Sequence, residues 1–170
     1  MFYLLSGDIC FLVEGVIYPV FPGDLVLFNV SESHKVSFYS KTDYERMSIH
    51  FSKSLFSDIP EFEKFLIPFS SRKLGRQNIL HESDFKDDYW KKCIENMLQK
   101  SRDHYSQVLS NLFPLMNEIY IAFDAKLKNQ PQPPGPPNLS QKVIDYINEH
   151  FTEDISVDSV ARIFFNSKTY

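Results

Sequence analysis

The sequence ICFLVEGVIYPVFPGDLVLFNV spans residues 9–30 and indicates the fold class of the N-terminal half. It contains three short runs rich in Val, Ile, Phe and Tyr, residue types that favour β-strands. Glu14-Gly15 separates the first two runs as a two-residue hairpin turn, in which Gly15 supplies a positive φ. Pro22-Gly23-Asp24 is a second turn, and the apolar run Leu25–Val30 follows it. We therefore expect consecutive short strands here.

Further strand-like runs lie on both sides of this stretch. Met1–Leu5 precedes it, and Lys35–Tyr39 and Tyr44–Phe51 follow it. In the last run apolar and polar residues alternate, so the two sets face opposite sides of a sheet. The apolar set is Met47, Ile49 and Phe51, and the polar set is Arg46, Ser48 and His50. Six short strands at this spacing predict an antiparallel sandwich or barrel.

Helical patterns occupy residues 52–129. In residues 52–82, apolar side chains are spaced for one short amphipathic helix that caps the sheet, and a polar, basic loop follows at 70–77. Residues 83–129 contain two helices, of which the second includes Pro114 as a kink or as its true start. The broad apolar surface of the second helix predicts a dimer interface, although both helices could instead be core. The residues expected at this interface are Leu109, Leu112, Met116 and Ile119.

Composition excludes several classes of protein. The chain has 170 residues, a net charge of −4 and two cysteines, which suits one or two small domains. Cys10 and Cys93 form no Cys/His cluster, so we expect reduced core thiols in a cytoplasmic protein. No run of ~18 apolar residues predicts a membrane span, and no secretion signal is evident. The acidic balance argues against nucleic acid as a partner of this chain.

Catalytic signatures are absent from the sequence. A catalytic metal site uses two or three His with a carboxylate, whereas the strand region offers only His34 and His50, with Glu14 and Glu45 as carboxylates. Gly-x-Ser-x-Gly and Gly-rich phosphate loops do not occur. We therefore expect no enzyme activity, no metal site and no cofactor.

Residues 139–170 read as a second, helical unit behind the Pro-rich segment 130–138. A helix is expected over 139–151, and Ser156 is a predicted N-cap for a second one. Two helices joined by a tight turn are typical of a helix-turn-helix.

Two parts of the chain resemble transcriptional regulators of the AraC/XylS type. The C-terminal positions that match the opening of that family's DNA-binding domain are Tyr146-Ile147, Ile155-Ser156, Val160-Ala161 and Ser167…Tyr170. The N-terminal segments similar to its cupin-like sensor domain are 5–15, 20–27 and His34. The resemblance implies an α+β chain with a cupin-like antiparallel β-barrel in 1–82 and dimerisation helices in 83–129. After the linker 130–138, a partial all-α helix-turn-helix unit would occupy 139–170. Compared with the family, the barrel lacks N-terminal strands and the DNA-binding domain is cut short, so we expect a truncated regulator.

The same resemblance implies the function. The chain would be the effector-sensing and dimerisation part of a bacterial regulator, acting as a homodimer and binding a small effector such as a sugar or a small acid. DNA would be a partner only of the full-length protein. The alternatives are a metal-dependent cupin enzyme acting on a small molecule, and a dimerisation module that senses nothing.

Candidate binding residues follow from this interpretation. A small barrel encloses a mostly apolar cavity with a few polar groups, for which the candidates are Tyr18, His34, Arg46, Ser48 and His50. The start of a recognition helix contacts DNA, which here means Asn166, Lys168, Thr169 and Tyr170. Residues 139–170 carry three basic residues against five acidic ones, so we expect no measurable DNA binding by this chain at physiological salt.

Overall fold

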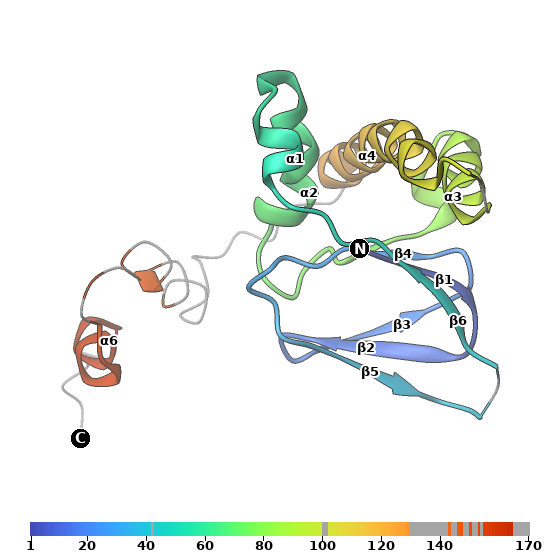
Figure 1. Cartoon of the computed structure of the whole chain (residues 1–170). Coiled ribbons are helices and arrows are strands. Elements are labelled where there is room, and N and C mark those ends of the chain that lie inside the picture. The colour runs from blue at the N-terminus through green and yellow to red at the C-terminus, as the bar shows by residue number, and fades with distance from the viewer. Residues whose placement is uncertain are drawn as a thin grey trace. The chain divides into compact units, whose positions relative to one another are not determined.

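The computed structural model in Figure 1 describes residues 1–41, 43–99 and 102–129. In the C-terminal part it describes residues 143, 146, 147, 150, 153 and 155–164. The chain divides into two compact units, Met1–Pro131 and Gln132–Tyr170.

Two antiparallel sheets form the base of the first unit. In the described part of the chain, the strands are β1 Phe2–Ser6, β2 Ile9–Val13, β3 Val16–Val20, β4 Leu25–Val26, β5 His34–Phe38, β6 Glu45–Ser48 and β7 Ile79–Leu80. One sheet has the order β6-β1-β4-β7 and the other the order β3-β2-β5. All six predicted strands form, although β4 is only two residues long. The sequence does not signal β7, because this apolar pair is too short to show a period.

The hairpin between β2 and β3 confirms the turn predicted at Glu14-Gly15. Gly15 has a φ of 79° and Glu14 a φ of 48°. Two successive positive φ values twist the turn in the sense that matches the flanking strands. Val13 and Val16 are therefore direct partners across the hairpin.

The four-stranded sheet is the middle layer of the first unit, between the other sheet and the helices (Figure 1). Phe2 and Val26 on one face pack with the inner face of the three-stranded sheet. Leu25 and Leu27 on the other face pack with Trp90 and its neighbours on the helices. Successive side chains of a strand point to opposite faces, so β1, β4 and β7 each contribute to both cores.

Helices cover the outer face of the middle sheet (Figure 1). They are α1 Ser54–Ser57, η1 Pro60–Leu66, α2 Ile67–Ser70, η2 Glu82–Asp84, α3 Tyr89–Leu98 and α4 His104–Asn129. The single helix predicted in residues 52–82 is wrong. Pro60 is the first residue of η1 and Pro68 the second residue of α2, and a proline lacks the N–H that would continue a preceding helix. The two helices predicted in 83–129 are α3 and α4. Pro114 lies inside α4 and does not mark its start.

The structure corrects the residues predicted for a dimer interface. Leu112, Met116 and Ile119 are at most 3% exposed and belong to the chain's own core. Leu109 is half-buried. Helix α4 contacts α3 on one side and η1 and α2 on another, so its broad apolar surface is used within the chain.

The mixed α+β class is confirmed, but the described strands form two sheets and no closed barrel. Strands β5 and β6 are edge strands of different sheets. The expected barrel closure does not occur because these two edges are not hydrogen-bonded to each other, and one side of the sandwich stays open.

The second unit contains α6, Val157–Phe164, among its described residues. The predicted N-cap is confirmed: Ser156 Oγ accepts the N–H of Ser159 at 3.1 Å, and Ser159 Oγ accepts the N–H of Ser156 at 2.9 Å. The predicted linker 130–138 lies outside the described residues. The predicted DNA-binding residues Asn166, Lys168, Thr169 and Tyr170 also lie outside them. No helix in the described part of the chain is long and apolar enough to cross a bilayer.

Candidate functional site

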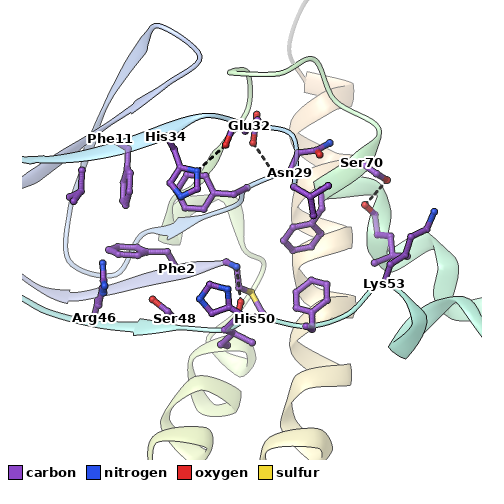
Figure 2. Close-up of a pocket in the computed structure, with 18 residues that line it drawn as sticks. Phe2, Phe11, Asn29, Glu32, His34, Arg46, Ser48, His50, Lys53 and Ser70 are labelled. Carbon is purple, nitrogen blue, oxygen red and sulfur yellow. Dashed lines mark hydrogen bonds between the residues drawn. The ribbon is translucent and has the colours of Figure 1, made fainter. Parts of the chain in front are cut away.

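A pocket of about 600 Å³ lies on the open side of the sandwich, between β5 and β6 (Figure 2). Its walls come from both sheets, from the segment after β4 and from the α1–α2 region. The lining residues are Met1, Phe2, Phe11, Phe28, Asn29, Val30, Glu32, His34, Val36, Arg46, Ser48, Ile49, His50, Phe51, Lys53, Leu66, Phe69 and Ser70. The structure thus brings together four predicted ligand-binding residues, namely His34, Arg46, Ser48 and His50.

Strand β6 and the residues after it supply a polar row along the pocket. Arg46, Ser48 and His50 follow one another along the chain at alternate positions (Figure 2). Met47 and Ile49, between them, pack against the core on the helix side. The alternation predicted from sequence therefore turns the polar set toward the three-stranded sheet and into the pocket.

Aromatic rings hold Arg46 at one end of this row. Its guanidinium carbon lies 5.6 Å from the ring centroids of Phe2 and Tyr44, and its Nη1 donates to the Tyr44 hydroxyl at 3.1 Å. Cation–π contacts of exposed groups contribute about 0.5–1 kcal/mol each. A guanidinium has five N–H donors, so the contact with Tyr44 uses one of them.

His34 forms part of an aromatic wall on the other side of the pocket. Its ring stacks on Phe28 with 4.0 Å between centroids, and Phe28 in turn makes an edge contact with Phe11 at 5.1 Å. His34 Nδ1 lies 3.0 Å from the main-chain oxygen of Glu32. A carbonyl oxygen only accepts, so Nδ1 is the donor in this hydrogen bond.

A buried ion pair between Glu32 and Arg72 supports this wall. Both side chains are 0% exposed, and Arg72 donates to the two carboxylate oxygens at 2.5 and 2.6 Å. The same carboxylate accepts the N–H groups of Asn29 and Gly75 and the side-chain amide of Asn78. Five hydrogen bonds therefore compensate the buried negative charge.

The ionisation of Glu32 reflects this environment. Burial by itself opposes the charged form, but the hydrogen bonds and the charge of Arg72, together with the N–H groups of Asn29 and Gly75, outweigh it. The pKa of Glu32 is therefore held below its ordinary value. The carboxylate stays ionised at neutral pH, and its charge is already matched by Arg72.

Arg72 also joins the pocket wall to the helical layer. Its guanidinium donates to the main-chain oxygens of Leu27, Pro68 and Arg76. The sequence gives no signal for this centre, because Glu32 and Arg72 lie in two polar loops 40 residues apart. Both look like ordinary surface residues until the fold buries them.

The fifth predicted ligand-binding residue, Tyr18, does not line the pocket. It lies on β3, and its hydroxyl donates to the Gly75 carbonyl at 2.8 Å. Gly75 has a φ of 66°, and a Cβ there would lie 2.7 Å from the Cβ of Glu14. The position therefore requires glycine. Tyr18 serves to hold the loop that carries Arg72.

Other reactive groups are not gathered into a centre. Among the described residues, no three His, Cys, Asp or Glu side chains are placed to hold a metal ion together. Cys10 and Cys93 are both buried and unpaired. Asp24 is buried, and its Oδ1 lies 2.8 Å from His81 Nδ1. This pair lies before the start of β4, whereas the pocket residues Phe28 and Asn29 follow the end of that strand.

We compared the chain with known protein families, with curated proteins and with solved structures, and found no match in any of them.

Proposed function

We propose that this chain is the effector-sensing and dimerisation part of an AraC-type transcriptional regulator. The observation that carries the proposal is the pocket between the sheets, whose polar groups converge from β5, from β6 and from His50, two residues after the end of β6. Ligand sites are typically apolar cavities of 300–1,000 Å³ with a few polar groups that orient the ligand. A pocket of about 600 Å³ with this lining fits that description.

The pocket also touches the layer through which an effector would act. Leu66 and Phe69 line it, and both belong to the core that contains Met116 of α4. Helix α4 is the last element before the predicted linker 130–138. An effector that fits one arrangement of these helices better than another shifts the population toward that arrangement. In the full regulator this shift would change how two DNA-binding domains are presented.

In this proposal the C-terminal residues of the chain would contact DNA. Asn166, Lys168, Thr169 and Tyr170 would begin the recognition helix, as the family resemblance implies. The acidic balance of residues 139–170 leaves few cations for phosphate contacts. We expect no gel shift with the 170-residue chain alone at physiological salt, and a salt-sensitive shift would contradict this expectation.

The pocket can be tested with a ligand screen and a matched pair of variants. Ser48→Phe places a large side chain in the pocket, whereas Ser37→Phe places the same side chain at an exposed position of β5, directly opposite Cys10. The assay is the Tm of the chain with a panel of sugars and small acids, together with its sedimentation with and without a ligand. A compound that raises the Tm of the parent and of Ser37→Phe, but not of Ser48→Phe, supports the proposal.

Two other results would support the alternatives. A dimer whose Tm no compound changes would be a dimerisation module that senses nothing. Near-stoichiometric Fe, Mn or Zn in elemental analysis would support the metal-dependent enzyme.

A further inference from the structure

The charged side chains that line the pocket outside the buried ion pair are positive. Arg46 and Lys53 are cations, and His34 and His50 carry no negative charge. Arg46 and Lys53 lie at opposite ends of the pocket (Figure 2). This lining contrasts with the chain as a whole, whose net charge is −4.

The acidic group in the lining, Glu32, does not offset these cations. Its carboxylate is 0% exposed and accepts both N–H groups of the Arg72 fork. It also accepts from Asn29, Gly75 and Asn78. A carboxylate with its lone pairs occupied and its charge paired neither attracts a ligand cation nor accepts from a ligand donor. Among the side chains of the lining, the charges that a ligand meets are therefore those of Arg46 and Lys53.

Most of the remaining lining is apolar, and the other polar residues in it are Asn29, Ser48 and Ser70. Phe11 and Phe28 form the aromatic wall, and Phe51 and Phe69 meet edge to face at 5.2 Å toward the helical layer. A ligand that fills this space must bury an apolar body between the rings. Such burial contributes about 25 cal/mol per Å² of apolar surface.

We propose that the pocket selects an organic anion, with its acidic head against Arg46, Ser48 and His50 and an apolar body between the phenylalanine rings. This inference rests on the proposed function and narrows its effector class from sugars and small acids to amphipathic acids. Arg46 would bind the head bidentately, since its planar fork matches a carboxylate. The Ser48 hydroxyl would donate one further hydrogen bond.

The test compares three probes with one body and three heads. They are 3-phenylpropionate, 3-phenylpropanol and 3-phenylpropylamine, titrated into the full chain by calorimetry with the Tm as a second readout. We expect the acid to bind and the alcohol and amine to bind at least about tenfold more weakly, because a hydrogen bond to a charged group contributes about 1.5–3 kcal/mol.

Variants locate the head group. Arg46→Gln should weaken the acid at least about tenfold and leave the alcohol unchanged, since the lost contact involves charge. Arg46→Lys keeps the charge without the fork and should recover part of the affinity. The control is Lys35→Gln. It removes a positive charge from an exposed position next to His34 on β5, and Lys35 does not line the pocket.

The outcomes separate this inference from the proposed function. If the alcohol, the amine or a sugar binds and the acid does not, the anion inference is wrong and the sensing function stands. Equal losses from Arg46→Gln and Lys35→Gln would also overturn it, because affinity would then follow net charge alone. If none of the probes and none of the sugars binds, both proposals fail.

Discussion

Replacing Arg72 by methionine should destabilise the first unit strongly. The change leaves Glu32 buried and charged while keeping a side chain of similar length. Removing one partner of a buried ion pair costs about 3–5 kcal/mol. Glu32 keeps three donors, from Asn29, Gly75 and Asn78, so we expect the lower end of that range, about 3 kcal/mol.

The assay is urea unfolding followed by tryptophan fluorescence. Trp90 is the single tryptophan of the chain and is 0% exposed, so its emission reports the unfolding of the first unit. Lys73→Met is the control, since it removes a charge from an exposed position next to Arg72. The control should change the free energy of unfolding by no more than about 0.5 kcal/mol.

The pH dependence gives a second, independent readout. In the parent chain the pKa of folded Glu32 lies below the ordinary value of 4.5, so the pair stabilises the fold above that pH and the contribution is lost as the pH falls through the folded pKa. Without Arg72, burial should place the pKa of folded Glu32 above its ordinary value. Protonation then stabilises the variant as the pH falls from 7 toward 5.

The difference between parent and Arg72→Met should therefore narrow on acidification. Glu32→Gln added to Arg72→Met removes the uncompensated charge and should recover about 1–2 kcal/mol at pH 7. A loss below about 1 kcal/mol for Arg72→Met would refute the reasoning. So would a difference from the parent that stays constant between pH 7 and pH 5.

Three further variants test the loop, the helical core and the helix interior. Gly75→Ala should lower the free energy of unfolding in urea by about 1–3 kcal/mol, because its Cβ would clash and its φ is positive. Gly15→Ala has open space around the new Cβ and should lower it by only about 1 kcal/mol, so equal losses would contradict this reasoning. Met116→Ala should lower the free energy of unfolding by about 2–5 kcal/mol at every protein concentration, because Met116 is buried in the core. The control is Ile121→Ala at an exposed position of the same helix. A loss that grows on dilution would indicate a dimer interface. Pro114→Ala should raise the Tm, because it restores a helical hydrogen bond, and a lowered Tm would show that the ring is needed for packing.

Local patterns predicted much of the fold. The six N-terminal strands, the Glu14-Gly15 hairpin and the two long helices each depend on residues within one turn or one period of each other. The row Arg46, Ser48 and His50 was predictable as a face for the same reason, since side chains alternate along any strand. The alternation along one strand does not say which other element that face will contact. For this reason the sequence pattern could not show that Tyr18 on β3 contacts the Gly75 loop and does not line the pocket.

The dimer residues show the same limit in a helix. A broad apolar stripe is equally consistent with a partner chain and with the chain's own core. The structure assigns Leu112, Met116 and Ile119 to the core because α3 on one side and η1 and α2 on another pack against α4.

The amino-acid sequence determined the six N-terminal strands, the helices α3 and α4 and which residues of a strand share a face, because these depend on neighbours along the chain. Only the folded chain showed that the sandwich stays open between β5 and β6 and that the polar row of β6 faces that opening. The Glu32–Arg72 pair likewise exists only in the folded chain. The carboxylate of Glu32 is stable in water, but in the interior it needs a positive partner, and folding brings Arg72 to it from 40 residues away in the sequence.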